Sequence, residues 1–159
     1  MLLQLNSMTY IDKQRIASDS AGWIENFGYW ITLNARTKDI IQFEQDLIQF
    51  ATWLNDYCYG AEFKRNEKRL KIIAGIESGK SYGGLHSHLI VTHANDTSRS
   101  FQEINTFVRK RWYKICNLSG SIFGSMVDVQ PLGNAEARLG YATKDINASS
   151  SDKLNIIYL

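Results

Sequence analysis

Hydrophobic and polar positions along this chain follow two repeats, one typical of strands and the other of helices. Runs rich in aromatic and β-branched residues predict strands at 27–34, 68–77, 85–93, 121–130 and 154–159. Apolar residues that recur every three or four positions predict helices at 38–57, 101–115 and 135–145. A polar tract at 147–152 predicts a loop before the last strand.

The order of these elements is strand, helix, strand, strand, helix, strand, helix, strand. This order predicts an α+β domain with a central antiparallel sheet of about five strands and flanking helices, related to the ferredoxin-like split βαβ arrangement. The chain has 159 residues, no internal repeat and one proline. We therefore expect residues 1–159 to form a single domain.

Composition narrows the class of protein. Apolar residues make up 44% of the chain and charged residues 21%, which is typical of a globular protein. No apolar run reaches the length of a membrane span, and the N-terminus lacks the pattern of a signal peptide. The two cysteines, Cys58 and Cys116, match no metal-binding spacing, so free thiols are expected. These features predict a cytoplasmic protein without membrane contact, or one inside the host cell if it is viral.

The net charge of +2 does not by itself indicate a nucleic-acid partner, but basic residues are clustered. One cluster spans 64–71 and a second spans 109–114. The second cluster mixes cations with aromatic residues, which suits a single-stranded backbone with stacking bases. Its candidate DNA-binding residues are Arg109, Lys110, Arg111, Trp112 and Lys114. The alternative interpretation is that both clusters are solvated surface patches.

Two of the three histidines lie one residue apart, in Leu85-His86-Ser87-His88-Leu89. Because successive side chains of a strand point to opposite faces, His86 and His88 share a face. Glu77 ends the preceding predicted strand, and a hairpin would bring it beside them. Two imidazoles and a carboxylate with open positions predict a site for Mn²⁺ or Mg²⁺ acting on a phosphate. His93 falls on the other face and is expected to be structural.

A second chemical signal lies on the last predicted helix, where Tyr141 and Lys144 are three residues apart. This spacing places both on one helix face. A tyrosine hydroxyl needs a base or nearby positive charge to act as a nucleophile, and Lys144 could stabilise charge that develops on a phosphate. Taken alone, the pair is also compatible with an ordinary half-buried tyrosine beside a surface lysine.

Three motifs together resemble the HUH endonuclease superfamily, and in particular the rolling-circle replication initiators (Rep proteins) of plasmids, phages and small viruses. They are Trp30-Ile31-Thr32-Leu33-Asn34, the histidine motif at 85–89, and Tyr141-Ala142-Thr143-Lys144. The motifs occur in the order found in that family. Two features depart from the usual pattern of the family. The middle residue of the histidine motif is the polar Ser87, and the residues of the first motif differ from the usual ones.

The resemblance implies an endonuclease that nicks and rejoins single-stranded DNA at a replication origin, often at a hairpin. Glu77, His86 and His88 would hold Mn²⁺ or Mg²⁺, and Tyr141 would form a 5′-phosphotyrosyl intermediate with help from Lys144. Thr32 and Asn34 would lie near the site or contact DNA. The sequence has no phosphate-binding loop of the helicase type, so unwinding would require a separate helicase.

Three alternatives to a Rep protein fit parts of the sequence. Relaxases of the same superfamily place the tyrosine before the histidines, which this chain does not. Single-strand DNA transposases share the present order but usually carry glutamine four residues after the tyrosine, where this chain has Asp145. A non-catalytic nucleic-acid-binding module could stack bases on Tyr29, Trp30 and Tyr82. Such a module has no need for paired histidines and an acid on one face.

Overall fold

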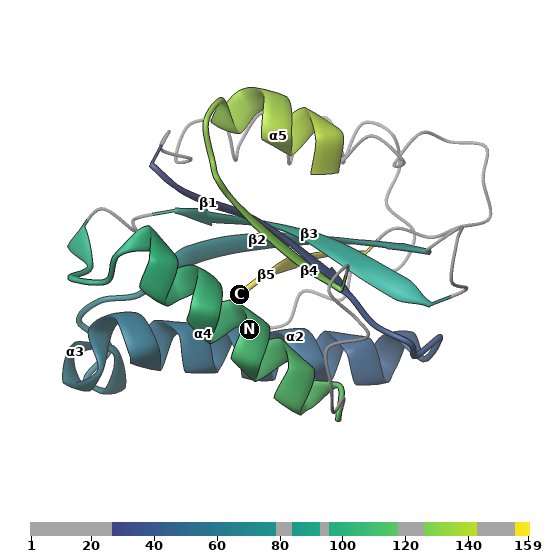
Figure 1. The fold of residues 1–159 in the computed structure, drawn as a ribbon, viewed down its shortest axis with the longest axis horizontal. Coiled ribbons are helices and arrows are strands. Elements are labelled where there is room, and N and C mark those ends of the chain that lie inside the picture. Colours follow the sequence, from purple (N-terminus) through teal and green to yellow (C-terminus); the bar gives the residue numbers. More distant parts are fainter. Residues whose placement is uncertain (1–26, 79–83, 93–95, 118–125, 143–154) are drawn as a thin grey trace.

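The computed structural model describes residues 27–78, 84–92, 96–117, 126–142 and 155–159. The strands are β1 (Gly28–Asn34), β2 (Lys71–Ser78), β3 (Leu85–Thr92), β4 (Val127–Pro131) and β5 (Asn155–Tyr158). The helices are α2 (Ile40–Tyr59), α3 (Ala61–Lys64), α4 (Phe101–Ile115) and α5 (Ala135–Ala142). The expected α+β class is confirmed (Figure 1).

The strands form one antiparallel sheet in the order β4-β1-β3-β2-β5. The sequence predicted a sheet of about five strands, the last of them short. Four strands, β4, β1, β3 and β2, make up the body of the sheet, and β5 is a four-residue strand on the outer edge of β2. The central strand β3 pairs with β1 on one side and with β2 on the other. Residues 86–92 of β3 therefore have a paired neighbour on both sides, which suits a strand that must hold side chains precisely.

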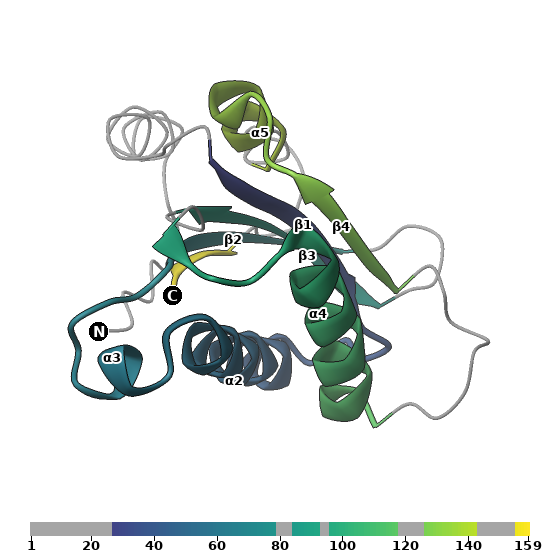
Figure 2. The same cartoon turned by 60° about the vertical axis from the view of Figure 1, so that its left-hand side comes forward.

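The sheet is covered on both faces (Figures 1 and 2). Helices α2 and α4 pack on one face, and α5 lies on the other. The main hydrophobic core lies between the sheet and the α2/α4 layer, where Phe43 and Phe50 of α2 meet the edge of Trp112 of α4. Burial of these large aromatic side chains removes apolar surface from water and stabilises the domain.

Both long helices begin at capping residues that the sequence supplies. The Asp39 carboxylate accepts hydrogen bonds from the backbone N–H groups of Ile41 and Gln42, at 3.0 and 3.2 Å. Ser100 and Glu103 form a reciprocal capping box at the start of α4. Each cap satisfies N–H groups that have no partner inside their helix.

The opposite face of the sheet carries a smaller apolar layer beneath α5. Leu139 and Ala142 of α5 are buried, as are Trp30 and Ile90 of the sheet. Gly75 of β2 makes this close packing possible, because a Cβ atom there would lie 2.7 Å from the carbonyl oxygen of Ala142. The end of α5 therefore rests directly on the middle of β2.

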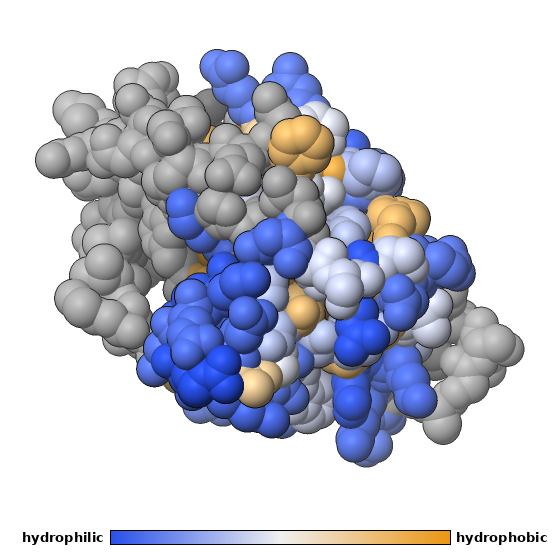
Figure 3. All heavy atoms as spheres, turned by 90° about the vertical axis from the view of Figure 1, so that its left-hand side faces the viewer, coloured by the Kyte–Doolittle hydropathy of each residue, from blue (hydrophilic) through white to orange (hydrophobic). Residues whose placement is uncertain are grey.

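Some element boundaries differ from the sequence-based prediction. The short helix α3 was not predicted, β2 begins at Lys71 rather than at residue 68, and β4 begins at Val127 within the strand predicted at 121–130. The surface around α3 and the adjoining ends of α2 and α4 is largely hydrophilic (Figure 3). None of the helices in the described ranges is long and apolar enough to cross a membrane.

Candidate functional site

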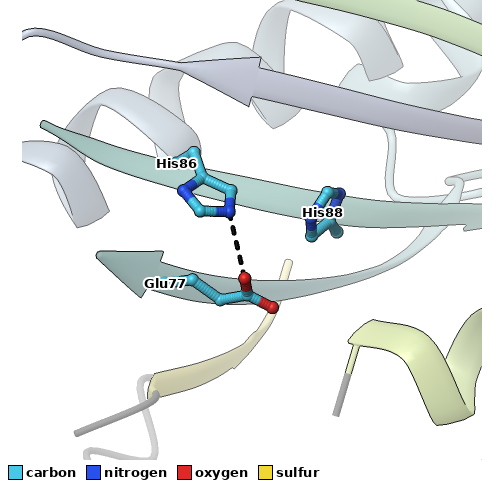
Figure 4. Close-up of side chains that lie close together, drawn as sticks. All are labelled: Glu77, His86 and His88. Carbon is cyan, nitrogen blue, oxygen red and sulfur yellow. Dashed lines mark hydrogen bonds and ion pairs between the residues drawn. The ribbon is translucent and has the colours of Figure 1, made fainter. Parts of the chain in front are cut away.

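The register of β2 and β3 brings the predicted metal ligands together. Glu77 lies directly opposite His86 in the antiparallel pairing, and Gly75 lies opposite His88. His86 Nε2 is 3.0 Å from Glu77 Oε2 (Figure 4). The candidate ligand atoms of Glu77, His86 and His88 all lie within 4.8 Å of one another. The prediction that these three side chains share one face of the sheet is confirmed.

The donor set fits a divalent cation. Glu77 and His88 are buried and His86 is partly buried, so an ion among them would be shielded from bulk water on the sheet side. Two ligands held at about 2.1 Å from an octahedral ion, at right angles to each other, lie about 3.0 Å apart. The distance between His86 Nε2 and Glu77 Oε2 has this value. Three protein ligands leave further coordination positions for water or substrate.

Thr32 of β1 orients the second histidine. Thr32 and His88 are paired across β1 and β3, and the Thr32 hydroxyl oxygen lies 3.0 Å from Nδ1 of His88. When Nε2 of such a ring binds an ion, Nδ1 carries a proton and donates it to a neighbouring oxygen. The Thr32 hydroxyl lies within hydrogen-bond distance to accept that proton, and the contact fixes the orientation of the His88 ring.

Trp30 forms the floor of the site next to His88. The two rings stack with their centroids 5.1 Å apart and their planes 11° from parallel. Trp30 itself is buried, at 3% exposure. The guanidinium of Arg138 lies 5.0 Å from the centroid of the Trp30 ring, and it donates a hydrogen bond of 2.8 Å to Gln130. His88 and Arg138 are thus both held against one aromatic side chain.

Tyr141 of α5 stands beside this group. Its ring meets His88 edge-on, with centroids 5.3 Å apart and planes at 79°, and meets Trp30 in the same way at 5.9 Å. Tyr141 is nevertheless 47% exposed. Tyr141 therefore lies at the rim of the candidate metal site and is open to solvent at the same time.

Ser87, the unusual central residue of the histidine motif, has a structural role. It points to the opposite face from the two histidines, is fully buried, and donates a hydrogen bond of 2.9 Å to the carbonyl oxygen of Gly75. Since a buried hydroxyl needs a partner, this bond explains why a polar residue is tolerated there. It also ties β3 to β2 at the pair that carries His88.

The basic residues of α4 lie away from this site. Arg109, Lys110, Arg111 and Lys114 belong to a helix on the opposite face of the sheet from α5. The prediction that Trp112 contacts DNA is wrong, because Trp112 is fully buried. Its indole N–H donates a hydrogen bond of 2.8 Å to the carbonyl oxygen of Asn34.

Two other predicted residues have different outcomes. Asn34 lies opposite His86 across β1 and β3, which places it at the edge of the site as expected. Lys144 lies outside the described residues, as does His93.

Sequence reasoning missed Arg138 and the role of Gly75. Arg138 precedes Tyr141 by three residues, so its place on the same helix face was predictable from the helical repeat. Gly75 carried no comparable signal, because its importance comes from a contact with a helix that is remote in sequence.

Comparisons with family models, curated proteins and solved structures found no match to this chain.

Proposed function

We propose that this protein is a metal-assisted endonuclease and strand transferase acting on single-stranded DNA, of the HUH type and similar to a rolling-circle replication initiator. One observation carries the proposal: Tyr141 is exposed and packs edge-on against His88. His88 is itself a member of the group of candidate metal ligands formed with Glu77 and His86. A nucleophile, a metal platform and an open approach then lie on one face of the sheet. We also propose that the antiparallel sheet and its helices are related to the ferredoxin-like fold expected for this superfamily.

The three ligands would hold Mn²⁺ or Mg²⁺, and Mn²⁺ suits a mixed nitrogen and oxygen set better than Mg²⁺ does. The ion, when bound, would act as a Lewis acid that polarises the scissile phosphate. Thr32 orients His88 through the contact with Nδ1, and the stacked Trp30 ring fixes the plane of the His88 ring. These neighbours make the site rigid before DNA arrives, which reduces the cost of reaching the transition state.

Tyr141 performs the covalent step. Its phenolic oxygen attacks the phosphorus atom, and the bond between that phosphorus and the 3′ oxygen of the preceding nucleotide breaks. The products are a 5′-phosphotyrosyl bond and a free 3′-hydroxyl group, and the phenolic proton leaves to the 3′ oxygen or to water. The reverse reaction rejoins the strand with no external energy source, since one phosphodiester is exchanged for another.

The burial of two aromatic residues argues against a non-catalytic binding module. That alternative needed Tyr29 and Trp30 as exposed stacking platforms, but they are 8% and 3% exposed. Tyr82 lies outside the described residues. A single-strand transposase stays the second candidate, because it would use the same nucleophile and metal ligands.

The experiment that tests this proposal captures the covalent intermediate. A pool of single-stranded DNA of randomised sequence is labelled at the 3′ end and incubated with the protein and Mn²⁺, and denaturing electrophoresis follows. We expect a labelled adduct that survives SDS, because the 3′ fragment is the one joined to tyrosine. A 5′-labelled pool should instead release shortened DNA with no adduct.

Variants assign the roles. Tyr141→Phe should abolish the adduct, and His86→Ala should reduce it at least tenfold. Tyr113→Phe is the matched control, since Tyr113 lies on α4 beyond the sheet, and it should leave the yield unchanged. An adduct of undiminished yield from Tyr141→Phe would refute the assignment of the nucleophile.

A further inference from the structure

A row of contacting aromatic rings and cations joins α2 and α4. The rings of Tyr57 and Phe107 stack with centroids 4.1 Å apart and planes 11° from parallel. The Arg99 guanidinium covers Tyr57 at 4.3 Å, and the Arg111 guanidinium lies 5.3 Å from the centroid of Phe107. We propose that this row, here called the α2/α4 ladder, is a second binding site whose ligand is the phosphate backbone of single-stranded nucleic acid.

Arg111 is the central residue of the ladder. Its guanidinium lies 5.2 Å from the Trp53 ring as well as 5.3 Å from the Phe107 ring, so two aromatic faces hold it in place. Lys114 follows one turn later and lies 5.8 Å from Trp53. Contact with a ring face does not use up the N–H groups of a guanidinium, and their fork geometry suits phosphate.

A cavity of about 410 Å³ opens beside the ladder. Lys110 and Arg111 contribute positive charge to its lining, and Gln102 and Thr106 contribute polar groups. Glu103 also lines it, but its carboxylate accepts a hydrogen bond from the Ser100 N–H and lies 3.6 Å from Arg99. The volume is in the range of sites that take a small molecule or a single nucleotide.

The ladder differs from the other basic cluster of the chain, at 64–71. There, Lys64 pairs with Asp56 at 3.2 Å, Arg65 with Glu67 at 2.7 Å, and Lys68 with Glu62 at 3.5 Å. Among the described residues, Lys110, Arg111 and Lys114 form no such ion pair. Arg99 of the ladder lies near Glu103, but the three cations on α4 keep a positive charge that no carboxylate of the described residues pairs with.

Phosphate is favoured over stacked bases as the ligand. The ring faces of Tyr57, Phe107 and Trp53 are already covered by each other or by cations, so a base could stack only by displacing them. The ladder should therefore bind nucleic acid with little dependence on base sequence. An acidic protein segment would use the same cations, and the test below separates it.

The ladder lies across the sheet from Tyr141 and the metal ligands, so this inference stands independently of the proposed nicking reaction. A strand that reached both faces would be anchored at a point remote from the cleaved bond.

The test measures binding of fluorescent 20-nucleotide oligo(dT) and oligo(U) by the full chain with EDTA present, at 50 to 200 mM salt. Replacing both Lys110 and Arg111 by Gln should weaken binding about tenfold, because two phosphate contacts are lost. The slope of log affinity against log salt should become shallower by about 1.4, at about 0.7 for each single-strand contact. Oligo(dT) and oligo(U) should respond alike.

The matched control replaces Lys64 and Lys68 by Gln. It removes the same charge from residues that are already ion-paired, and it should leave affinity and slope unchanged. Equal losses in both double variants, or none in the ladder variant, would overturn the inference. So would a poly-glutamate peptide that binds the ladder more tightly than oligo(dT) does. If the double variant folds poorly, the same binding measurement is made on Lys110→Gln alone, because Lys110 is exposed.

The two proposals can fail separately. If no covalent adduct forms but the ladder still binds oligo(dT), the protein binds nucleic acid and lacks the nicking activity. If the adduct forms as expected but the ladder variant binds oligo(dT) as tightly as the parent protein, only the proposal of a second binding site is refuted.

Discussion

The hydroxyl of Thr32 shows how much of the candidate metal centre depends on a residue that is not a ligand. It is 3.0 Å from Nδ1 of His88, and the register of β1 and β3 fixes the pair. Partners of metal-bound histidines orient the ring and set its tautomer, and their loss costs about 10- to 100-fold in metal affinity. The same side chain was expected from the sequence only to lie near the site or to contact DNA.

Thr32→Val removes the hydroxyl and keeps the shape of the side chain. We expect Mn²⁺ affinity, measured by calorimetric titration, to fall about 10- to 100-fold. Thr32→Ser should restore most of it. Thr52→Val, at an exposed threonine on α2 that bonds only within its helix, is the control. Unchanged affinity in Thr32→Val would show that His88 needs no such support.

The two cysteines provide a pH-dependent prediction at the same scale. Both are free thiols. Burial raises the pKa of Cys58 to about 11 and that of Cys116 to about 12. Burial, together with the hydrogen bond to Asp96, also raises the pKa of the Tyr59 hydroxyl.

Because these folded-state pKa values lie above the unfolded ones, the stability they contribute is fully present below about pH 9. It is lost as the pH rises through 11 to 12. We therefore expect the free energy of unfolding to fall steeply above pH 9, and iodoacetamide to alkylate the folded protein slowly at pH 8. Alkylation of Cys58 and Cys116 at the rate of an unfolded control would contradict the burial of Cys58 and the half-burial of Cys116.

At the scale of elements, the position of α5 decides whether Tyr141 reaches the metal ligands. The end of α5 rests on Gly75, where a Cβ atom would lie 2.7 Å from the Ala142 carbonyl oxygen. Gly75→Ala should push α5 from the sheet, because backbone atoms cannot move aside as a flexible side chain can. Tyr141 would then leave its contact with His88.

We expect Gly75→Ala to lower adduct formation at least tenfold while Mn²⁺ affinity changes less than threefold. Gly140→Ala is the matched control, since a Cβ atom at Gly140 meets nothing within 4 Å. The added methyl group should stabilise α5 by up to about 1 kcal/mol. Equal adduct yields from the two variants would show that the close approach of α5 is not required.

The same scale shows what the sequence could and could not predict. The helix and strand types followed from periodicity, and the pairing of His86 with Glu77 followed from a short hairpin. Trp112 was misread as a DNA contact, although Ile104, Val108 and Trp112 repeat every four residues and mark the buried stripe of α4. The basic residues next to Trp112 in the sequence favoured the interpretation as a DNA contact over the helical repeat.

At the scale of the molecule, the sheet separates two surfaces of different character. One carries α5, the ligand group and an exposed tyrosine, and the other carries the α2/α4 ladder. Periodicity identifies the apolar stripe of a helix but not the face of the sheet that it covers. That choice depends on connections and packing between distant segments, so the separation of the two surfaces could not be predicted from sequence alone.

The central claim is that Tyr141 becomes joined to DNA, and peptide mapping of the adduct by mass spectrometry tests it most directly. Trypsin should release Leu139–Lys144, which contains Tyr141 as its one tyrosine, between Arg138 and Asp145. We predict that this peptide carries a nucleotide phosphate on the tyrosine after incubation with single-stranded DNA and Mn²⁺. Attachment of the nucleotide to any other peptide, with Leu139–Lys144 unmodified, would contradict the account.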